Sequence, residues 1–180
     1  MINPIEIPKN QVFEFVHLHF DANFYNYYST LILRALYSDK YSFVYEKDCN
    51  DIYLHIIYKC EVREVENLIP DSNVLGLFFT LLPNNLICAG IIVEKDGKLY
   101  SSDKVKYYHN CLGDMHQLIS AVHKDLRFCK YCDHRTEKLY VNNFVNTTYK
   151  CCVVSCKDCS NKLPKKIIAE YVNAKLGLIL

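Results

Sequence analysis

The pattern of apolar and polar positions in the first sixty residues predicts three strands and one helix. Val12–Phe20 alternates apolar and polar residues, as a strand with one buried face does. Phe24–Leu36 places its apolar residues at helical spacing and predicts a helix. Tyr41–Tyr45 and Ile52–Tyr58 are rich in β-branched and aromatic residues, which favours strands. The segment that follows, Val62–Ile69, leaves helix and strand both open.

Three apolar runs in the middle of the chain predict a β-meander. The runs are Val74–Leu82, Leu86–Glu94 and Lys98–Ser101. Pro83-Asn84-Asn85 and Lys95-Asp96-Gly97 separate them, and Asp-Gly favours a hairpin because both residues tolerate positive φ. The uncharged stretch Ser72–Val93 has the length of a transmembrane helix. The Pro-Asn-Asn turn divides it into two pieces of strand length, so we expect no membrane span.

The last third of the chain predicts two helices around a small sheet. Asp114–Phe128 is amphipathic, with Asp114 as its N-terminal cap. Short strands with a turn at Asn142-Asn143 are expected next. Pro164–Leu176 begins with proline and ends before a glycine, which predicts a closing helix.

Two C-x-x-C pairs lie in this last third and predict a metal site. Cys129 and Cys132 form the first pair, Cys156 and Cys159 form the second, and 23 residues separate the pairs. Two residues between thiolates allow a tight turn to hold both sulfurs about 2.3 Å from a tetrahedral Zn²⁺. The spacing Cys152-x-x-x-Cys156 also suits a metal, so Cys152 is an alternative ligand in place of Cys156 or Cys159.

The chemistry of this cysteine set predicts structural zinc. The N-terminus lacks the pattern of a signal peptide, so we expect reduced thiols and a cytoplasmic protein, with the nucleus as the alternative. Four sulfur ligands fill a tetrahedral shell and leave no position for a reactive water. One structural Zn²⁺ is therefore the expected cofactor. No phosphate-binding loop or nucleophile motif occurs, and we expect no enzyme activity.

Charge is divided unevenly along the chain. The net formal charge is +1, but residues 1–100 carry −5 and residues 101–180 carry +6. Four thiolates with one Zn²⁺ add −2, which leaves the C-terminal half near +4. This balance favours an anionic partner for that half, and a solvated lysine-rich surface is the plain alternative.

Basic and aromatic residues surround the cysteine pairs and are candidates for RNA contact. Basic side chains contact phosphates, and aromatic faces stack on unpaired bases. The candidates are Lys124, Arg127, Lys130, Tyr131, Arg135, Lys157, Lys162, Lys165 and Lys166.

The cysteine region resembles the zinc ribbon of the NADH pyrophosphatases of the Nudix superfamily. The matching residues, in order, are Phe128, Cys129, Cys132, Cys156, Cys159 and Pro164. Asp133 stands where those ribbons usually have glycine, the segment between the pairs is long, and the chain has no glutamate-rich Nudix box. The resemblance covers the last third and implies a zinc ribbon without hydrolase activity. Similar ribbons occur in the beta subunit of translation initiation factor two and in transcription factors.

These observations predict an α+β protein with two parts. Residues 1–125 would form a mixed domain with the β-meander, and residues 126–180 a four-cysteine zinc ribbon with a C-terminal helix. The leading functional hypothesis is a non-catalytic factor that binds RNA or a ribonucleoprotein, with the ribosome as target and protein contacts through the acidic N-terminal half. Such a factor would occlude a functional site or stabilise an inactive particle. The alternatives are a transcription accessory factor that contacts polymerase or DNA, and a truncated NADH-pyrophosphatase-like protein that binds nucleotides.

Overall fold

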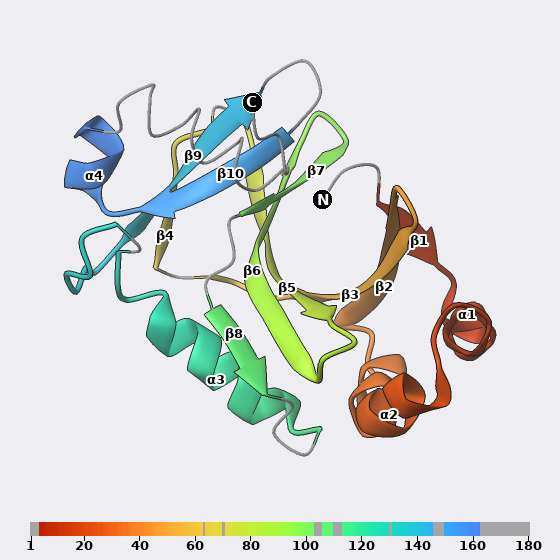
Figure 1. The fold of residues 1–180 in the computed structure, drawn as a ribbon. Helices are drawn as coiled ribbons and strands as arrows, with labels where there is room; N and C mark the ends of the chain where they lie inside the picture. Colours follow the sequence, from red (N-terminus) through yellow and green to blue (C-terminus); the bar gives the residue numbers. More distant parts are fainter. Residues whose placement is uncertain are drawn as a thin grey trace.

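The computed structural model describes residues 4–62, 64–69, 71–102, 106–109, 113–129, 131–145 and 150–162. These residues form an α+β structure with one large sheet, helices packed against it and a cysteine cluster near the C-terminal end (Figure 1). The predicted fold class is confirmed.

Ten strands of the described residues join in this sheet. They are β1 (Ile5–Ile7), β2 (Tyr41–Asp48), β3 (Asp51–Lys59), β4 (Val65–Asn67), β5 (Asn73–Leu81), β6 (Leu86–Lys95), β7 (Lys98–Ser102), β8 (Lys106–His109), β9 (Leu139–Val145) and β10 (Lys150–Ser155). Their spatial order is β1-β2-β3-β5-β6-β7-β10-β9-β4, and β8 pairs with the first half of β6. Neighbouring strands are antiparallel except at β7–β10 and β4–β9, which are parallel.

The predicted β-meander is confirmed as β5, β6 and β7. Asp96 and Gly97 both have positive φ (53° and 74°) in the β6–β7 turn, as the Asp-Gly signal requires. Because β5 and β6 form a hairpin, the uncharged stretch 72–93 is two strands. No helix within the described part of the chain is long and apolar enough to cross a membrane.

The principal helices pack their apolar residues into one core with the sheet. They are α1 (Val12–His19), α2 (Ala22–Leu36) and α3 (Met115–Asp125), with a 3-10 turn over Lys9–Gln11 and a short helix, α4 (Lys157–Lys162), near the cysteines. Asp21 accepts a hydrogen bond from the Phe24 N–H and begins α2 (2.8 Å), and Asp114 caps α3 in the same way. The expected helices over 24–36 and 114–128 are thus confirmed, although α3 ends at Asp125.

The strand predicted over Val12–Phe20 is wrong, because this segment forms α1. Its buried residues, Val12 and Val16, are four apart and share one helix face against the core. Leu18, which an alternating strand would bury with them, is 75% exposed. The alternating pattern therefore also contains the helical i, i+4 pair Val12 and Val16, and the packing of this pair against the core favours a helix over a strand.

Asn142 and Asn143 lie inside β9, so the predicted turn there is also wrong. Asn142 pairs with Val153 of β10 in the antiparallel ladder. Its side chain hydrogen-bonds to groups of β10 and α4, and these tertiary contacts override the turn preference of asparagine.

The ladder continues across the predicted boundary near residue 126, since β10 pairs with β7 and β9 with β4. The division into two domains stays a prediction. The expected helix over Pro164–Leu176 lies outside the described residues.

Candidate metal centre

The first cysteine pair lies in a tight turn directly after α3. The backbone N–H of Cys129 donates to the carbonyl of His134 (3.0 Å), and the N–H of Asp133 donates to the carbonyl of Cys129 (3.0 Å). Phe128 and Arg135 form an antiparallel bridge on either side of this turn. The chain therefore folds back on itself around Cys129-x-x-Cys132, so that both sulfurs lie on the same side.

Asp133 adopts the left-handed conformation, with a φ of 55°. This is the position at which the resembling ribbons usually have glycine. Aspartate is among the few residues with a side chain that visit this region readily, because its short polar side chain can hydrogen-bond locally. Asp133 thus allows the same left-handed turn after the first cysteine pair that glycine would allow.

The second pair lies at the beginning of α4. Cys156 precedes the helix, and its sulfur accepts a hydrogen bond from the backbone N–H of Cys159 (3.4 Å). The carbonyl of Cys156 accepts from the N–H of Ser160 (2.9 Å). Cys156 therefore occupies the position of an N-terminal cap, and one turn of helix brings Cys159 to the same side as Cys156.

The structure brings the sulfurs of Cys129, Cys132, Cys156 and Cys159 together, all within 4.8 Å of one another. The sulfurs of Cys132 and Cys156 are 3.8 Å apart. Four sulfurs at the Zn–S distance of about 2.3 Å in a tetrahedron are about 3.8 Å from each other, whereas a disulfide would place two of them about 2.05 Å apart. These cysteines are free thiols at metal-binding separation, and they could hold one zinc ion as predicted.

The protonation behaviour of the cluster also suits a cation. Burial raises the pKa of the Cys129 thiol, but hydrogen bonds to its sulfur from the Cys132 thiol and from three backbone N–H groups together lower the pKa to about 7. The donors are those of Cys156, Cys132 and Tyr131. Burial and the neighbouring cysteine sulfurs raise the pKa of Cys159. A bound divalent cation would favour the thiolate form of these sulfurs, because it places positive charge beside them.

A polar network joins the second pair to the sheet. The Asn142 amide donates to the carbonyl of Val153 (3.1 Å) and to the hydroxyl of Ser155 (3.0 Å). Its carbonyl accepts from the hydroxyl of Ser160 in α4 (2.6 Å). The side chain of Asn142 in β9 therefore fixes the short helix that carries Cys159, and the blue part of Figure 1 shows α4 beside β9 and β10.

Cys152, the alternative ligand, lies elsewhere. It is in β10, fully buried, and belongs to the hydrophobic core. Among the described cysteines, the group close enough to share a metal consists of Cys129, Cys132, Cys156 and Cys159.

The candidates for RNA contact fall into four groups. Four are exposed near the cysteine pairs: Lys124, Arg127, Arg135 and Lys157; Tyr131 is half-buried in the first turn. Arg127 also forms an ion pair with Glu64 (3.4 Å). Lys130, Lys165 and Lys166 lie outside the described residues, and of Lys162 only the backbone is described.

Sequence reasoning missed the role of Asn142 and a buried hydrogen-bond chain in the N-terminal part. His55 Nδ1 lies 2.7 Å from the hydroxyl of Thr80, and its Nε2 lies 2.8 Å from the Glu46 carboxylate. His55 and Thr80 are buried register partners on β3 and β5. The only signal in the sequence was a pair of polar residues at inward positions of otherwise apolar strands.

No protein-family model matches the chain, and neither the curated proteins nor the solved structures include a match. The resemblance to NADH pyrophosphatases accordingly rests on the matching residues of the cysteine region alone. What the geometry itself establishes is an α+β protein whose four clustered cysteines could bind one zinc ion.

Proposed function

We propose that this protein is a non-catalytic zinc-ribbon factor that binds RNA or a ribonucleoprotein, with the ribosome as its target. One observation carries the proposal: the turn of the first cysteine pair holds an exposed aromatic ring next to an arginine. Phe128 is 47% exposed and forms a β-bridge with the exposed Arg135. An aromatic face beside a guanidinium is a surface on which an unpaired base can stack while its phosphate is neutralised.

Charge supports the same partner. Lys124 and Lys157 are exposed near the two cysteine pairs, and the C-terminal half keeps a net charge near +4 with zinc bound. A zinc ion would hold these groups on a rigid surface and would leave no open coordination position for chemistry. Binding of this kind weakens steeply with salt, because each neutralised phosphate releases counterions.

Co-sedimentation with ribosomes at low and high salt tests the proposal. Binding is expected at low salt and should be lost at high salt and in the double variant Arg135→Glu/Lys157→Glu. Lys47→Glu/Lys59→Glu is the matched control, because it makes the same charge change at exposed positions on β2 and β3. Equal loss in both double variants, or no binding at low salt, would contradict the proposal. Binding to purified polymerase instead would favour the transcription alternative.

A further inference from the structure

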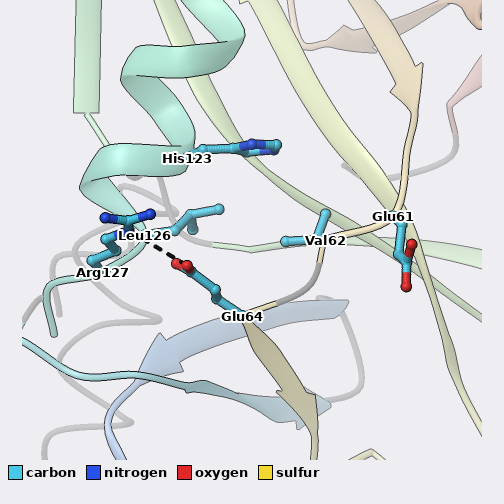
Figure 2. A pocket seen from close by; sticks show the side chains of 6 residues that line it. All are labelled: Glu61, Val62, Glu64, His123, Leu126 and Arg127. Carbon is cyan, nitrogen blue, oxygen red and sulfur yellow. Dashed lines mark ion pairs between the residues drawn. The ribbon is translucent and has the colours of Figure 1, made fainter.

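A pocket of about 310 Å³ opens beside the first cysteine pair, between the end of α3 and the segment that leads into β4. Its lining residues are Glu61, Val62, Glu64, His123, Leu126 and Arg127. Figure 2 shows the imidazole of His123 extending from α3 toward the segment that carries Glu61. A volume at the small end of ligand cavities, about 300 to 1,000 Å³, suits a single ring system.

The pocket contains a polar atom whose partner is missing. His123 Nε2 is buried and has no hydrogen-bond partner among the described residues. A buried ring nitrogen without a partner is rare in folded proteins and points to a bound group that would complete it. Depending on the tautomer, Nε2 can donate or accept.

The other polar groups of the pocket form a mixed set of donors and acceptors. Glu64 and Arg127 are joined through Arg127 Nε (3.4 Å), and a guanidinium has four further N–H donors on its Nη atoms. Glu61 also lines the pocket, but its carboxylate lies beyond Val62 and points away from Arg127 (Figure 2). A pocket for a cationic ligand would offer hydrogen-bond acceptors alone, and a pocket for an anion would offer donors alone. A neutral heterocycle with both kinds of edge fits this combination best.

The apolar walls favour a flat ring. Val62 and Leu126 face each other from the two sides of the pocket (Figure 2). Among the bases, guanine offers two adjacent donors, N1–H and the N2 amino group, which match a carboxylate. Its O6 and N7 are the acceptors that arginine contacts most often. Cytosine and adenine offer one amino group, and uracil offers one imide N–H, so none of them satisfies the Glu64–Arg127 pair as fully.

We propose that this pocket binds an unpaired guanine base. The N1–H and the N2 amino group of the base would donate to Glu64, its O6 would accept from Arg127, and His123 Nε2 would form a further hydrogen bond with the base. The inference rests on the proposed RNA-binding function, because Phe128 and Arg135 would hold the strand next to the pocket. Unpaired bases that leave the stack are commonly recognised in this way, by hydrogen bonds to their edges.

Fluorescence anisotropy with the zinc-loaded full chain tests the base preference. The probes are heptauridylate and the same heptamer with one central guanosine. The guanosine heptamer should bind about tenfold more tightly, which is the discrimination of one good bidentate contact. Glu64→Gln should reduce this preference to about twofold or less. Glu66→Gln should retain it, because Glu66 forms a comparable surface ion pair with Lys138 (2.8 Å) but does not line the pocket.

A second variant separates binding from folding. His123→Leu removes the unpartnered nitrogen, so its melting temperature should be unchanged or higher while the guanosine preference falls. Equal binding of both heptamers to the native chain would overturn the guanine assignment and leave RNA binding intact. Equal effects of Glu64→Gln and Glu66→Gln would also overturn it, because they would reduce the preference to general charge.

Free nucleotides test whether the pocket recognises the guanine base by itself or only within an RNA strand. Long-range ¹⁵N NMR of the His123 ring should show a shift with guanosine monophosphate and none with uridine monophosphate. If guanosine monophosphate shifts the ring while neither heptamer binds, the guanine assignment stands and the RNA function fails. If the ring responds to neither nucleotide and the heptamers bind equally or not at all, the pocket assignment is refuted.

Discussion

Replacing Asn142 with alanine is expected to weaken the zinc site without touching a ligand. The side chain makes hydrogen bonds with the carbonyl of Val153 and the hydroxyls of Ser155 and Ser160. At about 1 kcal/mol for each net bond, their loss should lower the free energy of unfolding by about 3 kcal/mol. Ser160 is in α4 with Cys159, so the same loss should leave this ligand less firmly positioned.

The expected cost in zinc affinity is about tenfold, at the lower end of what the loss of an outer-shell hydrogen bond causes. Competition with a chromophoric chelator measures the affinity, and urea unfolding of the zinc-loaded protein measures the stability. Asn67→Ala is the matched control. Asn67 also fixes a local turn, donating to the Ser72 carbonyl (2.6 Å) and accepting from the Ile69 N–H (3.0 Å), and neither of these hydrogen bonds involves Ser160 or a cysteine.

Asn67→Ala should therefore cost some stability and leave zinc affinity unchanged. Zinc binding by Asn142→Ala as tight as that of the native chain would refute this role of Asn142. Equal losses of zinc affinity in the two variants would refute it as well, because the loss would then follow global stability.

Two further predictions concern the N-terminal core. Burial lowers the pKa of His55 despite its bond to Glu46, so unfolding takes up a proton that the folded state resists. The contribution of His55 to stability is therefore full above its unfolded pKa of about 6.5 and declines as the pH falls below that value. His55→Gln should flatten the plot of unfolding free energy, measured with urea, against pH between about pH 6.5 and 5. An unchanged slope over this range would contradict the assignment. The buried Tyr28 hydroxyl donates to the carbonyls of Leu82 (2.7 Å) and Leu86 (3.0 Å) at the β5–β6 turn. Tyr28→Phe should therefore destabilise the protein by about 1 to 3 kcal/mol in thermal unfolding. A change below about 0.3 kcal/mol would show that this hydrogen bond is dispensable.

The parts of the fold that local patterns determine could be predicted from the sequence. The β5–β6–β7 meander follows from apolar runs between turn residues, and Asp114 predicts the start of α3 by its capping chemistry. The cysteine cluster could be predicted because C-x-x-C fixes two sulfurs within one turn, whatever the rest of the chain does.

The elements that depend on distant partners could not be predicted. Val12 and Val16 are buried because they pack against the core, and alternation along α1 does not reveal that contact. Asn142 lies in a strand because its amide finds partners on β10 and α4. The pocket at His123 is formed by residues about sixty positions apart, Glu61 to Val62 on one side and α3 on the other, and no spacing rule connects them.

Zinc content per chain tests the central claim most directly. Native mass spectrometry of protein purified without chelator should show one zinc ion, in the native chain and in Cys152→Ala alike. Cys132→Ser and Cys156→Ser should each lose most of the metal, because each removes one of the four clustered sulfurs. Less than about half an equivalent in the native chain, or loss of zinc in Cys152→Ala with retention in Cys156→Ser, would contradict the four-cysteine centre.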